Sequence, residues 1–457
     1  MDYRKYYKGE FWPKDQKEKK LFGLLKFVDG VAYIDLYGSF ISESKKSVEI
    51  GFVYGLLENN QFCIFHNCTH PRQNLFRSSN FLNFDFFIHA PKHLFKPSKG
   101  DNLEFTTVKF RFDFLSDWTG INVYEVFIDD EGNSGINIIH PDLKDFILFN
   151  DKDFLLRIAH QYSYPLSNSF SKYELSQESW LIAEINGELD FNGVFSFLEN
   201  IEEIFTLLNG KEIQLTTPFV LFTKLGSEFI CFKNRIKARF EPIVLSESNR
   251  IIHVPIFNLN QIQDLVLVRA FFESWPTVRF KYKDSIKSIV NCFKHRNLNP
   301  ESTFLNLAFA LEKIIEVDKG KIGDINEMSP DEQKHLSILV EKSVPQNTLN
   351  FISARLKKKS GKRLKEKVAQ YFLQLNCPLD QLIGKDQELF VNKLVDSRNH
   401  LAHLCDSCKD QMRGEEYPIF NKKLLKVLYL IIFLKMGLPK EGIIKNLRTN
   451  PNIALEF

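Results

Sequence analysis

The C-terminal half of the chain is organised around one short stretch. It reads Asp396-Ser397-Arg398-Asn399-His400-Leu401-Ala402-His403. Apolar residues from Leu389 to Val395 precede it at helical spacing, which predicts a helix over 387–404 with the polar residues at its inner end. Such a helix packs an apolar stripe against a core and presents a polar cluster beside it.

The spacing within this stretch brings three functional groups together. Arg398 and His403 lie five residues apart, about 140° around a helix, an angle that the long arginine side chain spans. Asn399 and His403 are one turn apart on one face, where their side chains can meet. RNA cleavage needs a base for the 2′-hydroxyl, an acid for the leaving oxygen and a cation for the developing phosphorane charge. Arg398, His403 and Asn399 are therefore the candidate catalytic residues.

The same motif also has a purely structural interpretation. An arginine followed a few residues later by a histidine arises by chance about once in a chain of this size, so Arg398 can be a surface residue and His403 an ordinary cap. Glu312, on another predicted helix, can orient either residue or form an exposed ion pair. Asp396 and His400 complete the possible supporting residues.

A concentrated cationic segment covers residues 355–367, with eight Lys and Arg against a single Glu. A local field of this kind contacts phosphates, and a solubilising charged face is the alternative. The candidate RNA-binding residues are Arg355, Lys357, Lys358, Lys359, Lys362 and Arg363. The basic run over 233–239 could also touch RNA, but a solvated strand face is the preferred interpretation.

Two groups of His and Cys residues offer zinc binding as another role. They are Cys63, His66, Cys68 and His70 in the first group, and His403, Cys405 and Cys408 in the second. The first group continues a strand, where successive side chains alternate faces, which disfavours one tetrahedral site. The second resembles half a site, and if it bound zinc, His403 would be a ligand and not a catalyst. We predict no metal and no cofactor.

The totals describe a folded protein of more than one domain. At 457 residues the chain has room for two or three domains, and 44% hydrophobic with 26% charged residues is typical of globular proteins. No segment has the roughly 18 consecutive apolar residues of a membrane span, and no export signal follows the N-terminus. Seven scattered Cys suit a reducing compartment, so we expect a cytoplasmic protein with no membrane partner.

Charge and aromatic content both change near residue 281. Residues 281–457 carry 30 Lys and Arg against 21 Asp and Glu, whereas residues 1–280 carry 30 against 36. Only nine of the 44 Phe, and none of the four Trp, follow residue 280. The C-terminal part is therefore the expected polyanion binder, and two domains of different class are the simplest account.

Strand-like runs dominate the N-terminal half and helical periodicity the C-terminal half. Residues 103–114 alternate cleanly, with Val108, Phe110, Phe112 and Phe114 on one face, and Asp29-Gly30 predicts a hairpin turn. Helical spacing begins near Leu259 and breaks at Trp275-Pro276. It resumes at Asn299-Pro300, an N-cap followed by Pro at the first helical position.

These patterns predict an α+β multidomain chain. A β-rich, sandwich- or barrel-like domain covers residues 1–260, with a possible division into subdomains near 118–150. A helical connector covers 261–299, and an all-α helical bundle covers 300–457.

Both halves resemble known families. The bundle resembles the HEPN superfamily, whose signature is Arg, four to six residues, then His, and Arg398, Asn399 and His403 match it. The N-terminal half is similar to that of ApeA-type abortive phage-exclusion proteins. The matching stretches include Gly9-Glu10-Phe11-Trp12-Pro13, Gly23-Leu24-Leu25-Lys26-Phe27, Leu36-Tyr37-Gly38-Ser39-Phe40 and Leu115-Ser116-Asp117-Trp118, with 304–312 and 434–438 in the C-terminal half. The Cys405/Cys408 pair has no place in the family pattern.

The resemblance implies a metal-independent HEPN endoribonuclease that serves antiphage defence by abortive infection. It implies RNA as substrate, with tRNA as a target, 2′,3′-cyclic phosphate ends, and a homodimer that brings two Arg–His sets to one cleft. The β domain would restrain the nuclease and sense a phage-encoded trigger. The alternative is a non-catalytic HEPN module that binds RNA or dimerises, joined to a ligand-sensing β domain.

Overall fold

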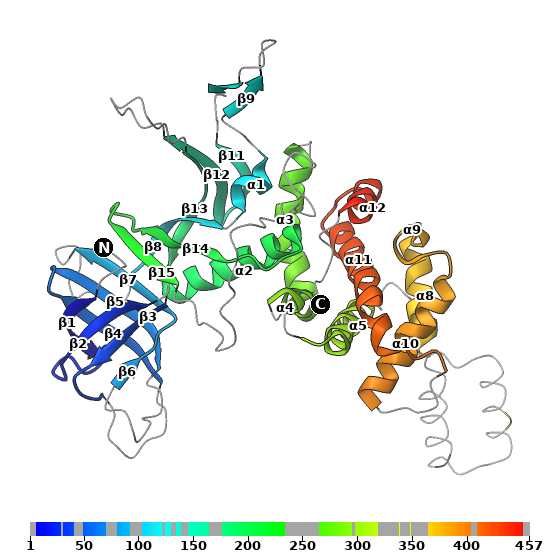
Figure 1. Ribbon diagram of the computed structural model, residues 1–457, viewed down its shortest axis with the longest axis horizontal. Coiled ribbons are helices and arrows are strands. Elements are labelled where there is room, and N and C mark those ends of the chain that lie inside the picture. The colour runs from blue at the N-terminus through cyan, green and yellow to red at the C-terminus, as the bar shows by residue number, and fades with distance from the viewer. Residues whose placement is uncertain are drawn as a thin grey trace. The chain divides into compact units, whose positions relative to one another are not determined.

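The chain folds into two compact units in the computed structural model (Figure 1). Unit 1 comprises Met1–Glu202 and Ile213–Ile252, and unit 2 comprises Glu203–Glu212 and His253–Phe457. The structure describes residues 6–28, 31–40, 49–69, 80–91, 103–112, 114–120, 124–128, 134–138, 145–163, 176–233, 265–294, 298–318, 338, 348, 364–403 and 409–450. The predicted fold class, a β-rich domain followed by a helical one, is confirmed. The predicted domain boundaries at 260 and 299 stay predictions.

In its described residues, unit 1 is built from antiparallel strands and two helices. The strands are β1 Tyr7–Pro13, β2 Leu21–Val28, β3 Val31–Leu36, β4 Glu49–Leu57, β5 Gln61–Thr69, β6 Asn80–Leu82, β7 Phe86–Pro91, β8 Phe105–Phe112, β9 Tyr124–Ile128, β10 Ser134–Ile138, β11 Phe146–Asn150, β12 Phe154–Ser163, β13 Ser176–Leu189, β14 Leu215–Phe222 and β15 Glu228–Lys233. The helices are α1 Leu115–Thr119 and α2 Phe191–Asn209, whose last residues are counted with unit 2.

Thirteen of these strands form one sheet, in the order β11-β12-β13-β8-β14-β15-β7-β5-β4-β1-β2-β3-β6. The predicted hairpin at 29–30 is confirmed, because β2 and β3 pair from Gly23↔Leu36 to Val28↔Val31. A separate bridge joins Thr69 at the end of β5 to Asn83 beyond β6, so the β1–β7 part of the sheet curls back on itself. This part has the barrel-like curvature visible in blue in Figure 1.

Aromatic residues fill the inside of this curled sheet. The Phe65 ring lies 5.9 Å from that of Phe11, 4.8 Å from that of Phe84 and 5.8 Å from that of Phe87, and none of the four side chains is more than 2% exposed. Gly55 leaves room for them, since a Cβ there would come within 2.8 Å of the Phe11 ring. The high Phe content of the N-terminal half therefore serves packing.

Unit 2 consists of helices. They are α3 Leu265–Lys281, α4 Lys283–Lys294, α5 Pro300–Val317, α8 Leu364–Leu375, α9 Asp380–Ile383, α10 Gln387–His403, the 3-10 helix η4 Gly414–Glu416, α11 Tyr417–Lys435 and α12 Lys440–Thr449. Asn299 caps α5 as predicted, because its side chain accepts a hydrogen bond from the Ser302 backbone at 2.8 Å. Helix α11 is buried on nearly every side from Leu424 to Phe433, which marks it as the core helix of this unit.

Two local predictions are wrong. Helix α3 does not break at Trp275-Pro276 but continues through Pro276 to Lys281. Phe271, Phe272 and Trp275 are all buried, and their packing outweighs the hydrogen bond that proline removes. The alternating strand ends at Phe112, and Phe114 instead precedes α1 with a left-handed φ of 71°.

Some predictions fall outside the described residues. These are the candidate RNA-binding residues Arg355 to Arg363, the basic run beyond Lys233, and His70, Cys405 and Cys408.

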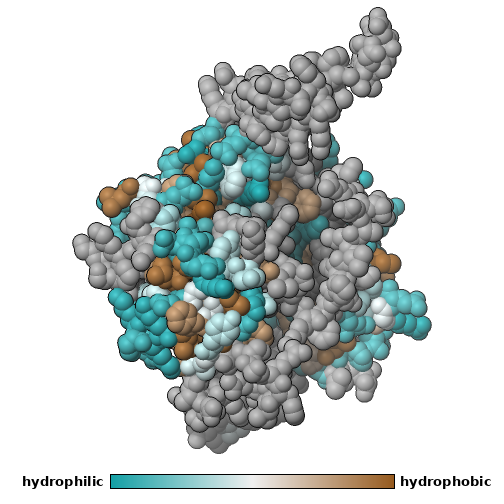
Figure 2. Space-filling model, turned by 60° about the vertical axis from the view of Figure 1, so that its left-hand side comes forward, coloured by the Kyte–Doolittle hydropathy of each residue, from teal (hydrophilic) through white to brown (hydrophobic). Residues whose placement is uncertain are grey.

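The surface that Figure 2 presents is mostly hydrophilic, with small, separate hydrophobic patches between the grey areas. The most exposed large apolar residues among the described ones are Leu225, Phe280, Leu373, Tyr37 and Phe22. No described helix is long and apolar enough to cross a membrane.

Candidate active site

Packing on three helices fixes the end of α10 where the polar residues lie. Phe390 is buried and stacks on Phe420 of α11, with 4.4 Å between ring centroids and 10° between planes. Val391, Leu394 and Val395 are also buried, and α10 contacts both α5 and α8. The residues that follow, from Asp396 to His403, are therefore held on a rigid element, as precise chemistry requires.

Asp396 and Ser397 anchor the chain that returns after α10. The Ser397 hydroxyl is fully buried and accepts a hydrogen bond from the Met412 backbone at 2.7 Å. The Asp396 carboxylate accepts one from the Asp410 backbone at 3.1 Å and pairs with Lys365 Nζ at 2.9 Å. Asp396, expected as a supporting residue, thus holds the chain after α10 and Lys365 of α8.

Arg398 is the hub of the site. Its Nε and one terminal nitrogen donate to the two carboxylate oxygens of Glu312, at 2.7 and 3.1 Å. The other terminal nitrogen donates to Asn399 Oδ1 at 3.2 Å and to His403 Nε2 at 2.9 Å. Glu312 belongs to α5 and Arg398 to α10, so the site joins two helices. The two contacting residues are 86 positions apart in sequence. The structure therefore brings Arg398, Asn399 and His403 together on one helix, and adds Glu312, whose place was left open by the sequence.

The hydrogen bond to His403 determines where its ring proton lies. A guanidinium can only donate, so His403 Nε2 must accept and carries no proton in this arrangement. The neutral ring then holds its proton on Nδ1. An unprotonated nitrogen on an exposed imidazole is the form that can take a proton from a hydroxyl.

Charge balance in the site depends on Glu312 and Arg398. Their side chains are 24% and 18% exposed, and the two-pronged geometry fixes the plane of the guanidinium. The Glu312–Arg398 pair is neutral as a whole. Because Glu312 covers one edge of the guanidinium, an anion can approach only the terminal nitrogen near His403 and Asn399. His400 lies on the same helix and is partly buried.

One residue of the site was not predicted from sequence. Phe309 of α5 lies beside Arg398, whose Cζ is 5.4 Å from the ring centroid, and the ring is 39% exposed. Helical spacing places it away from the buried face of α5, but its contact with Arg398 depends on how α5 packs against α10.

Zinc binding by the first His and Cys group finds no support in the described residues. Cys63 and Cys68 are fully buried in the core of the curled sheet, whereas His66 Nε2 lies 3.2 Å from Asn192 Oδ1 of α2. Across the described part of the chain, no cluster of three or more His, Cys, Asp or Glu is arranged to hold a metal ion.

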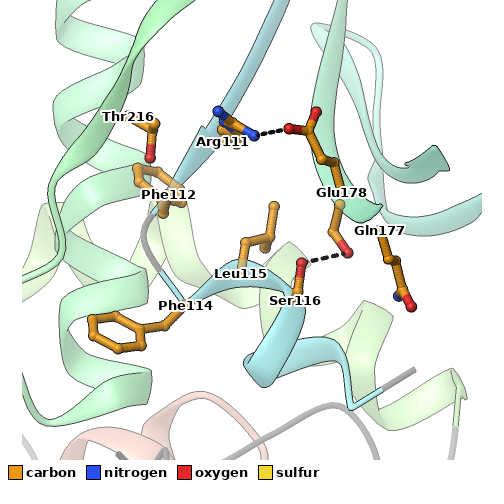
Figure 3. Close-up of a pocket in the computed structure, with 9 residues that line it drawn as sticks. Arg111, Phe112, Phe114, Leu115, Ser116, Gln177, Glu178 and Thr216 are labelled. Carbon is orange, nitrogen blue, oxygen red and sulfur yellow. Dashed lines mark hydrogen bonds and ion pairs between the residues drawn. The ribbon is translucent and has the colours of Figure 1, made fainter. Parts of the chain in front are cut away.

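A polar cavity of about 260 Å³ lies in unit 1, where β8 ends and α1 begins (Figure 3). It is lined by Arg111, Phe112, Phe114, Leu115, Ser116, Gln177, Glu178, Ser179 and Thr216. Arg111 pairs with Glu178 at 2.6 Å, and Ser116 donates to the buried Ser179, whose hydroxyl lies 3.0 Å from His160 Nδ1. Burial lowers the pKa of His160, which keeps this chain of hydroxyls next to a neutral imidazole. The cavity offers both donors and acceptors to a ligand.

Comparison with known families agrees with both halves of the structure. The family model of the ApeA N-terminal domain 1 matches residues 6–268, more than half of the chain. The chain belongs to the ApeA family. The model of the Apea-like HEPN domain matches residues 305–442, which include Glu312, Arg398 and His403. This family is one of defence-associated HEPN nucleases. No curated protein and no solved structure is significantly similar to the chain.

Proposed function

We propose that the chain is an antiphage endoribonuclease that cuts RNA by a metal-independent mechanism centred on Arg398 and His403. The observation that carries this proposal is the contact between Arg398 and His403 Nε2 at 2.9 Å, with the arginine held by Glu312 from another helix. This arrangement supplies a cation, a base and their support in one rigid group.

The first step is the exchange of partners at Arg398. A phosphodiester oxygen takes the guanidinium nitrogen that now bonds His403 and Asn399, while Glu312 continues to hold the opposite side. The released Nε2 of His403 then accepts the proton of the 2′-hydroxyl. Asn399 is free to orient the phosphate or the imidazole.

The 2′-oxygen then attacks the adjacent phosphorus, and the bond to the 5′-oxygen breaks. A 2′,3′-cyclic phosphate and a 5′-hydroxyl result, and the leaving oxygen needs one proton. His403, protonated in the first step, can return that proton, or the His403 of a second copy, in its protonated imidazolium form, can supply it. Arg398 stabilises the additional negative charge of the phosphorane.

The wider assignment follows from the family and the architecture. We propose a homodimer that pairs two Arg–His sets, tRNA among the targets, and abortive infection as the outcome in a cytoplasmic setting. The cationic segment with Arg355 to Arg363 would hold the RNA backbone. The β domain would sense a phage-encoded trigger, and the polar cavity beside Ser116 and Arg111 is the feature that favours this ligand-sensing role.

The test is RNA cleavage by purified protein in excess EDTA, with total tRNA and a mixed-sequence single strand as substrates. We expect cutting by the native protein, with cyclic phosphate ends. Arg398→Ala should slow it by about 10²- to 10³-fold and His403→Ala by about 10²- to 10⁴-fold. Arg448→Ala, on α12, is the matched control and should cut normally.

Three other outcomes have defined meanings. Cutting that EDTA abolishes would support a metal role for His403 with Cys405 and Cys408. RNA that is bound with a steep salt dependence but never cut would support the non-catalytic HEPN alternative. If lysate from phage-infected cells starts the cutting and uninfected lysate does not, the enzyme is latent until triggered.

A further inference from the structure

Phe309 is an exposed aromatic side chain that folding of this chain does not explain. Its neighbours Ala308 and Ala310 are buried, whereas Phe309 is 39% exposed. Full burial of such a side chain would stabilise the fold, and this position forgoes part of that gain. Its place in the molecule is specific, because it touches the guanidinium of Arg398 and precedes Glu312 by one helical turn.

We propose that Phe309 stacks on a nucleobase next to the phosphate held by Arg398, and that the substrate is therefore a single-stranded segment of RNA. The inference rests on the proposed function and adds the class of substrate. A phosphate that replaces His403 at the guanidinium lies beside the Phe309 ring, so the base of the same or the next nucleotide can reach it. Bases in a duplex are already stacked on each other, and only an unpaired base is free to turn onto a side chain.

The surroundings of Phe309 suit a nucleic acid better than a second apolar surface. Lys313 is 56% exposed on the next turn, and its ion pair with Glu316 lies at the surface, where it is weak. Arg398 contacts the ring, and Lys313 follows Phe309 by one helical turn, so two cations belong to the same part of the surface. An aromatic ring flanked by cations is the usual platform for one base and its phosphates.

The experiment measures RNA binding separately from RNA cutting. His403→Ala protein serves as the background, and fluorescence anisotropy reports its affinity for a mixed-sequence single strand and for the same strand annealed to its complement. Phe309→Ala, Phe309→Leu and Phe309→Trp are compared in this background. Phe280→Ala is the control, because Phe280 is 87% exposed on α3.

We expect Phe309→Ala and Phe309→Leu to weaken single-strand binding by about 5- to 100-fold, since one base stacked on an aromatic ring contributes about 1–3 kcal/mol. Phe309→Trp should restore single-strand binding. The affinity for the duplex should not change in any Phe309 variant, and Phe280→Ala should bind both RNAs as the background protein does. Leucine fills similar space without a flat ring, so it separates stacking from packing.

Four results would overturn the inference. They are unchanged binding in Phe309→Leu, equal weakening of single strand and duplex, absence of single-strand binding in the background protein, and conversion of a dimer to a monomer by Phe309→Ala. The last would assign Phe309 to an interface between copies. Protein that binds single strands through Phe309 but never cuts them would instead overturn the nuclease function alone.

Discussion

At the scale of single residues, Glu312 decides how Arg398 can act. It holds the guanidinium through two hydrogen bonds at 2.7 and 3.1 Å, and both partners are largely buried. A guanidinium fixed in this way presents its free side to the substrate without reorganisation. Glu312 is therefore a positioning residue, because it acts on the phosphate only through Arg398.

Glu312→Gln should lower kcat by about 10- to 100-fold and leave KM almost unchanged. The arginine stays charged in this variant and still binds phosphate. The amide has one acceptor oxygen where the carboxylate has two, so the plane of the guanidinium is no longer fixed. The measurement is initial rate against RNA concentration, with Glu316→Gln as the control, because Glu316 lies on the same helix and pairs with Lys313 at the surface. Equal loss in both variants, or a change in KM alone, would contradict the positioning role.

How far the candidate site follows from sequence depends on the distance between its residues. Arg398, Asn399 and His403 share one helix, so helical spacing alone places them together. Glu312 could be proposed but not placed, because its contact depends on how α5 packs against α10. The contact of Phe309 with Arg398 and the contacts of Asp396 with the chain after α10 had no signal in sequence, since both depend on tertiary packing.

At the scale of elements, one buried carboxylate ties the helices of unit 2 together. Asp318 follows α5 and is 3% exposed. It accepts hydrogen bonds from the hydroxyls of Tyr282 at 2.6 Å and Tyr371 at 3.0 Å, and pairs with Lys435 at 2.7 Å and Lys281 at 3.2 Å. These partners lie on or beside α3, α8 and α11. Burial opposes ionisation of Asp318, but the bonds from Lys435 and Tyr282 outweigh it and lower its pKa to about 2.

Asp318→Asn should lower the free energy of unfolding by about 3–5 kcal/mol, because it leaves two buried tyrosines and the partly buried Lys435 around a neutral amide. Urea unfolding measures the loss, and Asp284→Asn, exposed in the first turn of α4, is the control.

The sign of the pH dependence follows from the lowered pKa of Asp318. The carboxylate contributes fully above its unfolded pKa of about 4, and the contribution disappears as the pH falls to about 2. The difference in free energy of unfolding between the native protein and Asp318→Asn should therefore shrink as the pH falls from about 4 to about 2. A difference that stays constant would refute the stabilising role of the Asp318 carboxylate.

Element boundaries followed from sequence where the signal was local. Asn299 caps α5, as its place before Pro300 predicted. Proline at 276 was misread as a break because its local preference is overridden by the packing of α3. The order of the sheet had no local signal. Strand β8 pairs with β13 and β14, and β15 with β7, through contacts between residues far apart in sequence.

At the scale of the whole molecule, the proposed mechanism gives each chain one exposed histidine for two proton transfers. A single His403 can serve in turn as base and acid, but a homodimer that joins two Arg–His sets supplies one imidazole for each transfer. A symmetric interface would bring the same surface of both copies to one cleft. Activity would then belong to the dimer and not to the chain.

We therefore expect dimers by light scattering, and a specific activity that falls on dilution together with the dimer fraction. Mixing provides the sharper measurement. Native protein allowed to exchange with an excess of His403→Ala chains should lose activity, because most native chains would then face a partner without an imidazole. Phe280→Ala chains, altered at an exposed site on α3, should cause no loss in the same exchange. Undiminished activity in the His403→Ala mixture would show that one chain completes both proton transfers, and His403 would then act alone as base and acid.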